Sequence, residues 1–510
     1  MSDSLRENTP PEPIWRKDVL LPSFPALAEN LSCDVVVAGG GITGITTACL
    51  LAKEGLSVIL VEADQLLNGT TGHTTAKVTI QHDLIYDELI QHFGLEKTKQ
   101  YYAANQSALD FIKNTIAAAN LDCGYVEQDA YLYATTKSSA DKLKKEYEAY
   151  QKIGIPGEIL DNIPLELNVE AALKVPKQVQ FHPIKYLQHL VDSFLEAGGK
   201  IFEQTTAKEI QKDTKIKVVM RSGHSIECSH LAACTHFPFI DEKGFYFTRM
   251  HADRSYVITA ACKKEFPGGM YLSVDEPKRS IRSVECDGQH LLMIGGESHK
   301  AGQSKENEEK HYQALAEFAE DVFDAAGIHS KWSAQDLITL DKVPYIGPIT
   351  SSKPSILIAT GYRKWGMTNG TYAAHLLKDY VLGKSNPYSE VFNPSRFKAD
   401  PSVKHFIKEN ANVAAELIKG KLSFPGNSLD DLQKDEGAIV MYNDDRTGAY
   451  RDLEGNLHLV DVTCTHLGCE CEWNSGDKTW DCPCHGSRFT YDGDVVEGPA
   501  KKPLKIIEPY

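Results

Sequence analysis

Cysteine and histidine residues near the end of the sequence have the types and the spacing of metal ligands. One arm contains Cys464 and His466, and a second arm contains Cys482 and His485. Thiolate and imidazole groups in this arrangement bind zinc and also bind iron–sulfur clusters, so the ligand spacing alone leaves both metals open. Three further cysteines lie in the same stretch, namely Cys469, Cys471 and Cys484. This crowding predicts a site rather than core packing.

A glycine-rich turn near the other end of the sequence has the pattern of a phosphate-binding loop. Gly39, Gly41 and Gly44 follow the apolar run 33–38, and a second apolar run ends at Glu62. Glycine lets the backbone approach a pyrophosphate, the N-terminus of the following helix attracts its charge, and the acid can accept ribose hydroxyls. The pattern predicts a βαβ unit that binds a dinucleotide. It occurs once, so we do not expect a separate NAD(P)H domain.

The elements that must position these residues follow from the periodicity of apolar residues. Residues 356–361 predict another buried strand that ends in glycine, with a helix over 368–382. Between the two glycine segments we expect an inserted helical segment over 81–181 with one short strand, strands over 200–235 that return to the first sheet, and an antiparallel sheet over 239–340. Short alternating strands over 438–462 predict a small β domain around the cysteines.

Length, composition and charge restrict the class of protein. The chain has 510 residues, is 42% hydrophobic and carries a formal net charge of −16. Two or more domains are expected, because single cores stop growing near about 250 to 300 residues. The acidic balance, without a block of lysine or arginine, disfavours nucleic acid as a partner. No apolar run is long enough to be a transmembrane segment and no secretory signal is readable, so we expect a cytoplasmic protein.

Taken together, the early glycine motif, the late segment 359–368 and the intervening sheet resemble the D-amino-acid-oxidase and glycine-oxidase superfamily of flavoproteins. This resemblance implies an α/β, Rossmann-like FAD-binding domain with an inserted antiparallel-sheet substrate lobe. It also implies that one set of residues contacts FAD: Gly39, Gly41, Gly44, Glu62, Thr70, Thr71, His73, Gly361, Gly366, Met367 and Thr368.

The same resemblance raises two more specific questions. Some dehydrogenases of this superfamily attach FAD covalently through a histidine at the position of His73, whereas the alternative is a polar contact without a bond. The catalytic residues are not assigned, and five residues are candidates for the substrate pocket because arginine suits a carboxylate and the tyrosines lie beside it: Arg254, Tyr256, Arg282, Tyr362 and Arg363.

The C-terminal motifs Cys-Thr-His-Leu-Gly-Cys and Cys-Pro-Cys-His-Gly-Ser are similar to those of Rieske [2Fe-2S] proteins of the cytochrome bc type, which favours the cluster over zinc. The resemblance implies that Cys464 and Cys482 bind one iron and that His466 and His485 bind the other. It further implies a disulfide between Cys469 and Cys484. Cys471 has no place in the pattern. Ser487 matches a serine that donates a hydrogen bond to the cluster in high-potential relatives, whereas Phe489 replaces a donor tyrosine.

The whole chain thus resembles bacterial Rieske proteins that carry an N-terminal flavin oxidoreductase. We expect a lead segment (1–32), an FAD-dependent oxidoreductase (33–385), a connector (386–424) and an all-β Rieske domain (425–510). The predicted function is an amine or amino-acid dehydrogenase that passes electrons from FAD to one [2Fe-2S] cluster and then to an external one-electron acceptor. The alternatives are a reductase in which electrons enter through the cluster, or a non-catalytic redox sensor or electron-transfer protein.

Overall fold

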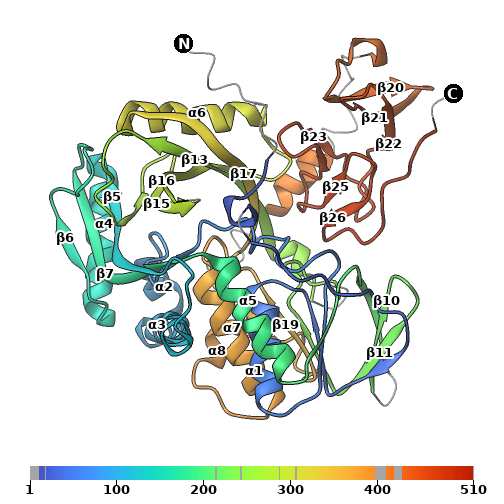
Figure 1. Ribbon diagram of the computed structural model, residues 1–510, viewed down its shortest axis with the longest axis horizontal. Coiled ribbons are helices and arrows are strands. Elements are labelled where there is room, and N and C mark those ends of the chain that lie inside the picture. Colours follow the sequence, from blue (N-terminus) through green and yellow to red (C-terminus); the bar gives the residue numbers. More distant parts are fainter. Residues whose placement is uncertain are drawn as a thin grey trace.

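The structure, a computed structural model, describes residues 11–17, 19–212, 215–241, 244–286, 288–304, 307–396, 409–417 and 428–508. Parts of the predicted connector, 397–408 and 418–424, lie outside the described residues. Within the described chain the strands form five sheets. Two large sheets and a smaller one build the N-terminal part, and two small sheets build the C-terminal part (Figure 1).

The first large sheet has six strands, in the order β18-β19-β12-β2-β3-β8. Five of them are parallel, and β18 runs antiparallel at one edge. Their bounds are β2 (Val35–Ala38), β3 (Val58–Val61), β8 (Lys200–Phe202), β12 (His230–Ala233), β18 (Tyr345–Pro348) and β19 (Ile356–Thr360). The helices α1 (Ile42–Lys53), α5 (Pro183–Glu196) and α7 (Gly366–Val381) pack together on one face.

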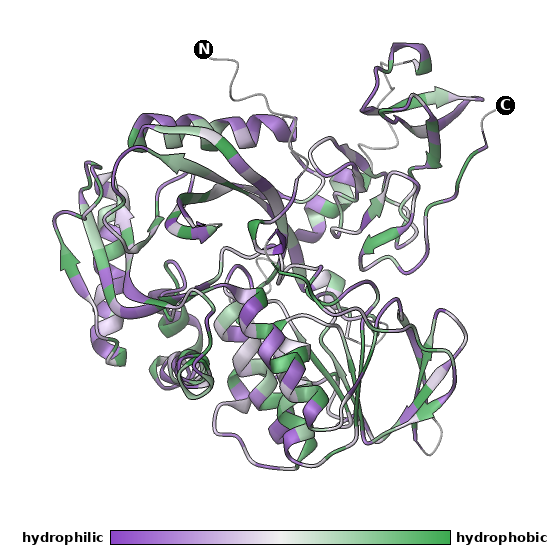
Figure 2. Ribbon diagram, in the orientation of Figure 1, coloured by the Kyte–Doolittle hydropathy of each residue, from purple (hydrophilic) through white to green (hydrophobic). Residues whose placement is uncertain are grey.

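Both faces of this sheet are buried, because each strand sends alternate residues to opposite sides. In β2, Val35 and Val37 pack in the same core as α1, whereas Val36 and Ala38 pack in a second core. The second core is shared with a four-stranded sheet of β1 (Leu31–Ser32), β9 (Ala207–Lys212), β10 (Ile216–Met220) and β11 (Ser225–Cys228). Figure 2 shows the strands between these layers in the colour of hydrophobic residues.

The four-stranded sheet corrects one expectation from the sequence. Residues 200–235 were expected to return to the first sheet, but only β8 and β12 do so. β10 and β11 pair with each other as an antiparallel hairpin, with Val218 opposite Ile226. Residues of β10 alternate between buried and half-buried, as they do in a sheet that covers a core on one side only.

The second large sheet has nine strands and forms a separate lobe, with α6 (Glu308–Phe323) packed on it. It is antiparallel except for the pair β14 and β5. Its strands are β4 (Lys77–Val78), β5 (Val126–Ala134), β6 (Glu158–Leu160), β7 (Ala171–Gln180), β13 (Met250–Cys262), β14 (Met270–Ser273), β15 (Arg279–Cys286), β16 (Gln289–Lys300) and β17 (Ala325–Thr339).

This lobe differs from the expected sheet over 239–340, because it also recruits strands from the predicted insert 81–181. The insert contains the helices α2 (Tyr86–Phe93), α3 (Leu95–Ala119) and α4 (Lys137–Ile153), but its strands β5 and β7 pair into the lobe. Tyr131 of β5 lies opposite Tyr271 of β14, and their rings stack at 4.8 Å between centroids. Cross-strand aromatic pairs of this kind stabilise a sheet and are not visible in local periodicity.

The described part of the predicted lead segment is integrated into the N-terminal part. Ile14 and Trp15, in the short helix η2 (Ile14–Arg16), are buried in the same core as α1. The Trp15 indole donates a hydrogen bond to Thr74 O at 2.7 Å, and β1 pairs with β11. After α7, the chain makes the short helix α8 (Ser389–Phe392), and residues 409–417 are helical. No helix within the described residues has the length and apolar character to cross a membrane.

The C-terminal domain is all-β, as expected from the sequence. Its two antiparallel sheets are β20-β21-β22 and β23-β24-β25-β26. The strands are β20 (Glu436–Tyr442), β21 (Asp445–Arg451), β22 (Leu457–Asp461), β23 (Glu472–Asn474), β24 (Thr479–Asp481), β25 (Arg488–Thr490) and β26 (Val495–Glu497), preceded by η4 (Leu429–Asp431). The two cysteine–histidine loops connect β22 to β23 and β24 to β25. Both loops therefore emerge at the second sheet.

The glycine turn after β2 allows a direct test of the first domain. A Cβ at Gly44 would overlap the carbonyl oxygen of Gly39, whereas a Cβ at Gly69 would meet nothing within 4 Å. We expect Gly44→Ala to lower the free energy of unfolding by about 3 kcal/mol through overpacking. Gly69→Ala is the matched control and should leave it nearly unchanged. Denaturant unfolding of both variants measures this, and equal stability of the two would contradict the tight turn.

Candidate functional site

The first part of the candidate site is the turn between β2 and α1. Gly39 has φ +108°, and a Cβ there would lie 2.5 Å from Cys234 O, so only glycine fits. Gly41 is the N-cap of α1 and has no side chain to cap the first turn. A Cβ at Gly41 would meet only Thr71, at 3.0 Å. The open N-terminus of α1 therefore suits a pyrophosphate.

Polar residues line the two sides of this turn. Glu62, directly after β3, accepts hydrogen bonds from Gly40 N at 2.6 Å and from Asp64 N at 3.0 Å. Desolvation by burial raises the pKa of Glu62 despite these donors. Thr71 Oγ1 accepts a hydrogen bond from Ile42 N at 3.1 Å. The carboxylate and the hydroxyl thus flank the glycines from opposite sides, as a nucleotide with ribose and phosphate groups requires.

The late glycine segment lies against the same helix. Gly361 has φ +78°, and a Cβ there would overlap the Thr339 side chain. Thr43 in α1 donates a hydrogen bond to the Tyr362 hydroxyl at 3.0 Å. α7 begins at Gly366, so Met367 and Thr368 lie buried in its first turn. The structure thereby brings both predicted glycine segments together at the N-termini of α1 and α7.

His82 organises the late segment and was not identified from the sequence. Its Nε2 lies 2.9 Å from Thr79 O and 3.0 Å from Thr368 Oγ1, and its Nδ1 lies 2.8 Å from the Tyr101 hydroxyl. Its carbonyl oxygen accepts a hydrogen bond from the Arg363 guanidinium. Desolvation lowers the pKa of His82 to about 3, so the imidazole is neutral. It is therefore a positioning group and not a charged one.

The segment with Thr70 and His73 lies between the two large parts of the molecule. His73 Nδ1 lies 2.9 Å from Gly69 O, and the Trp332 indole donates to His73 O at 2.9 Å. Desolvation lowers the pKa of His73. A covalent bond to FAD would have to form at Nε2, because Nδ1 is engaged. Covalent attachment and a polar contact therefore both stay predictions.

Two cations lie together in the substrate lobe, one predicted and one not. Arg282 in β15 is 2% exposed and donates to Thr75 O at 2.6 Å, with its guanidinium 5.2 Å from the Trp15 ring. Its Nη2 is buried and has no hydrogen-bond partner among the described residues. Lys77 in β4 donates to Tyr271 O at 2.9 Å. Desolvation lowers the pKa of Arg282 to about 9, and desolvation together with Arg282 lowers that of Lys77 to about 7.

The structure places Arg254 and Tyr256 in contacts that differ from the expected substrate pocket. Arg254, with 0% exposure, forms ion pairs with Asp477 and Asp481 of the C-terminal domain. Tyr256 stacks on His299 and on His311. The prediction of a substrate carboxylate at Arg254 is corrected by this geometry, because two carboxylates of the chain itself already occupy its guanidinium. Tyr362 and Arg363 do lie in the late glycine segment beside α1 and α7.

The cysteine–histidine loops converge on one point in the C-terminal domain. The Sγ atoms of Cys464, Cys471 and Cys482 lie within 4.8 Å of one another, and all three residues are buried. The neighbouring thiols of Cys471 and Cys482 lower the pKa of Cys464. The rings of His466 and His485 are 5.0 Å apart. His466 Nδ1 is buried and has no hydrogen-bond partner in the part of the chain that the structure describes, which suits a metal ligand.

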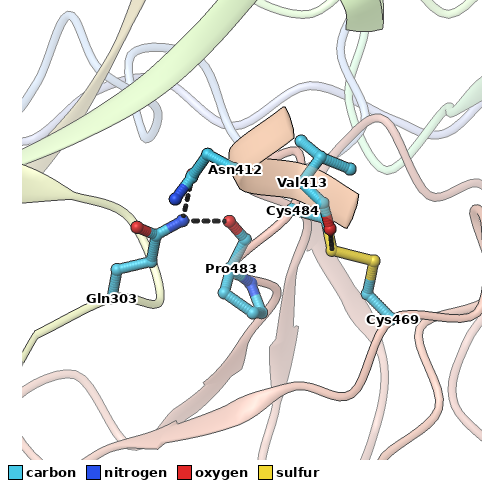
Figure 3. Close-up of a disulfide and its surroundings, with 6 residues drawn as sticks. All are labelled: Gln303, Asn412, Val413, Cys469, Pro483 and Cys484. Carbon is cyan, nitrogen blue, oxygen red and sulfur yellow. Dashed lines mark hydrogen bonds between the residues drawn. A yellow bond between two sulfur atoms is a disulfide. The ribbon is translucent and has the colours of Figure 1, made fainter. Parts of the chain in front are cut away.

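A disulfide braces the two loops. Cys469 of the first loop is bonded to Cys484 of the second (Figure 3). Gln303 of the N-terminal part reaches the same place and donates to Pro483 O at 2.8 Å and to Asn412 Oδ1 at 2.9 Å (Figure 3). The cluster loops are therefore fixed to each other and to the neighbouring domain.

The histidine side of these loops faces the N-terminal part. Phe247 in η3 (Tyr246–Thr248) places its ring edge-on at 5.1 Å from His466 and at 5.3 Å from His485. Asp241 holds η3 by accepting hydrogen bonds from Tyr246 N and Phe247 N. The Gln335 side-chain amide donates to Gly486 O at 2.8 Å, while the backbone carbonyl of Gln335 accepts from the Thr70 hydroxyl at 3.3 Å. One residue thus connects the predicted FAD segment with the loop of His485.

The residues present fit both groups that the motifs imply. The glycine cradle and the N-terminus of α1, where Gly41 brings no capping side chain and Thr71 accepts from Ile42 N, fit the pyrophosphate of FAD. Two thiols and two imidazoles at one point fit a [2Fe-2S] cluster with mixed ligands. The sequence missed Lys77, His82, Phe247 and Gln335. Only Lys77 carried a local signal, as a charged residue in the apolar run 76–80.

Comparison with known proteins agrees with this geometry. Residues 34–380 match the family model of FAD dependent oxidoreductases (DAO), and residues 424–508 match the Rieske [2Fe-2S] domain. A Rieske 2Fe-2S iron-sulfur protein of Bacillus subtilis, YhfW, is 50% identical over 498 residues, which cover 98% of each chain. Gamma-glutamylputrescine oxidoreductase of Escherichia coli is 20% identical over 72% of this chain and 88% of its own.

Among solved structures, glycine oxidase from Geobacillus kaustophilus superposes with a TM-score of 0.61 at 18% identity. The match covers 72% of this chain and all of that chain, and at this identity it shows the fold. The predicted fold class and the two cofactors, FAD and a [2Fe-2S] cluster, are thereby confirmed. The protein acts on a small molecule and exchanges electrons with a partner. The chain belongs to the FAD-dependent oxidoreductase (DAO) family, related to amine and amino-acid oxidases, and carries a C-terminal Rieske [2Fe-2S] domain.

Proposed function

We propose that this protein is a dehydrogenase that oxidises an amine or amino acid bearing a carboxylate, and that it passes the electrons from FAD to its own Rieske cluster. The observation that carries the proposal is the contact between the two sites. Gln335 hydrogen-bonds to Thr70 in the predicted FAD segment and to Gly486 beside His485. This contact supports electron transfer within the chain, because it links the predicted FAD segment to a loop of the proposed cluster ligands.

The ligand set that we propose for the cluster follows from the Rieske motifs, and the convergence of the loops supports it. Cys464 and Cys482 would hold one iron, and His466 and His485 would hold the other. Phe247 of the N-terminal part contacts the rings of both histidines, so these two residues would hold their iron on the side of the C-terminal domain that contacts the N-terminal part. When bound, FAD takes two electrons from a substrate, and the cluster takes electrons one at a time. An external acceptor then receives the electrons. The cytoplasmic location of the protein stays a prediction.

The substrate class follows from the two cations of the substrate lobe. No carboxylate of the described residues pairs with Lys77 or Arg282, although desolvation depresses the pKa of both. A buried cation without a paired anion costs free energy, and binding of an anionic ligand removes that cost. We propose that these residues hold a substrate carboxylate while the carbon–nitrogen bond lies at the flavin. Oxidation of that bond to an imine releases two electrons and two protons, one from carbon and one from nitrogen.

Electron flow is the first prediction. Glycine and γ-glutamylputrescine, suggested by the names of the relatives, serve as candidate substrates in anaerobic stopped-flow mixing with the loaded protein. We expect flavin bleaching first, followed by cluster reduction in the same chain. Gln335→Met should slow the second phase severalfold and leave the first unchanged. Gln128→Met, in β5 of the substrate lobe, is the matched control.

Other outcomes of this experiment separate the alternatives. Reduction of the cluster by an external donor, followed by flavin reduction without any amine, would favour the reductase running the opposite way. A redox sensor would give neither phase with any amine, although both groups would still titrate. Equal rates of cluster reduction in Gln335→Met and in the unmodified protein would contradict electron transfer through the Gln335 contact.

Carboxylate recognition is the second prediction. Benzoate is the anionic probe and benzamide is its neutral counterpart, and binding is followed by the perturbation of flavin absorbance. Lys77 is cationic below its pKa of about 7 and neutral above it, so benzoate should bind more weakly as the pH rises through this value. Loss of one charged hydrogen bond, about 1.5 kcal/mol, corresponds to roughly a tenfold rise in Kd.

Two variants control this measurement. Lys77→Met should weaken benzoate binding at pH 6 and remove the pH dependence near 7, while leaving benzamide binding unchanged. Arg282→Met should weaken benzoate binding over the whole range. If benzoate and benzamide bind equally in the unmodified protein, the site does not recognise a carboxylate. The electron-transfer prediction is independent of this result.

A further inference from the structure

A buried hydrogen-bond acceptor lies unused in the substrate lobe, next to the two cations Lys77 and Arg282. Gln180 is the last residue of β7 and is 6% exposed. Its amide Nε2 donates to Ser283 O at 3.0 Å, so Oε1 is the acceptor of this side chain. That oxygen is buried and has no hydrogen-bond partner within the described chain. Folded proteins rarely keep such an atom unpaired, because it costs free energy, so a ligand is its expected partner.

Two contacts place this acceptor beside the cations. Arg282 Nη1 donates to the same carbonyl oxygen of Ser283 at 3.1 Å, so the Gln180 amide and the guanidinium lie side by side. Lys77 of β4 is the register partner of Gln180 in β7. Residues directly opposite each other in an antiparallel pair send their side chains to the same face of the sheet. Three strands, β4, β7 and β15, therefore bring the three side chains together.

The unused atoms of these neighbours have complementary chemistry. Arg282 keeps one buried donor, Nη2, without a hydrogen-bond partner in the described part of the molecule. Gln180 Oε1 is an acceptor without charge. A cationic donor suits a carboxylate, whereas a neutral acceptor suits an N–H or O–H group. Because both side chains bind one carbonyl oxygen, a small ligand reaches both when its carboxylate and its hydrogen-bond donor lie only a few bonds apart.

We infer that Gln180 determines substrate specificity by accepting a hydrogen bond from the N–H of the substrate amine. With the carboxylate on Arg282 and Lys77, the substrate is then an amino acid whose primary or secondary amine lies on the carbon that bears the carboxylate. A tertiary amine has no N–H in its neutral form and would leave the buried acceptor unpaired, so the site rejects it. This inference rests on the proposed function, which places the carboxylate at the two cations.

The test compares two planar acids of nearly the same shape, pyrrole-2-carboxylate and furan-2-carboxylate. The first has an N–H on the carbon that bears the carboxylate, and the second has an oxygen in that place. Each acid is titrated into the full chain loaded with FAD and cluster, and the perturbation of flavin absorbance gives Kd. We expect pyrrole-2-carboxylate to bind about tenfold more tightly, the effect of one hydrogen bond. Equal Kd values in the unmodified protein would overturn the inference without any variant.

A pair of variants locates the preference at one side chain. Gln180→Met removes the acceptor at similar side-chain length, so the two acids should bind equally, through weaker binding of pyrrole-2-carboxylate. Gln128→Met in β5 is the matched control and should keep the preference, because Gln128 Oε1 already accepts from Gly269 N at 2.8 Å. A preference that survives in Gln180→Met contradicts the inference. So does a flavin spectrum that changes in folded Gln180→Met before any acid is added, since the acceptor would then contact the flavin.

Failure of the proposed carboxylate site gives a different result in the same titrations. Arg282→Met should weaken the binding of both acids and keep the preference between them. If Arg282→Met binds both acids as tightly as the unmodified protein does, the carboxylate does not lie at the cations, and the proposed substrate class fails together with the inference. If Arg282→Met weakens both acids but the unmodified protein does not distinguish them, the carboxylate site stands and only the role of Gln180 is refuted.

Discussion

A buried ion network holds the molecule together at the point where its two functional parts meet. Arg254, in the middle of β13, donates to Asp481 at 2.8 Å and also binds Asp477. Arg488 of the cluster domain binds the same two carboxylates. Because a buried charge is tolerated only with its partners in place, the network makes the two domains mutually dependent. The position of the cluster loops over Phe247 and Gln335 depends on this network.

The network also fixes the position of the cluster domain against the N-terminal part. Asp481 directly precedes Cys482, so the residue that anchors the domain is adjacent in sequence to a proposed iron ligand. Asn474 orients the same carboxylate through a 2.8 Å hydrogen bond. Glu308 at the start of α6 accepts two hydrogen bonds from Ser475, which extends the contact across the substrate lobe. The residues that fix the position of the domain therefore also lie next to a proposed iron ligand.

Short sequence motifs were enough to predict those residues of the site that lie close together in the chain. The glycines of the first turn and the cysteine–histidine arms have fixed spacing, because the turn and the loops are short. Contacts across the chain were not predictable in this way. Arg254 looks like a substrate arginine in its own strand, and its partners lie more than 220 residues away. Likewise, the sequence predicted one short strand in the insert, around residues 131–134 of β5, but not its pairing with β14 of a distant segment and not the strand β7.

The contact between Trp15 and the substrate cations has a consequence for the order of assembly during synthesis. Trp15 lies over Arg282 and donates to Thr74 O, so this contact joins the lead segment, the segment after β3 and β15. A ribosome must therefore release more than half of the chain before this contact is complete, and contacts of such long range form slowly. Until β15 emerges, the Trp15 indole has no guanidinium to cover.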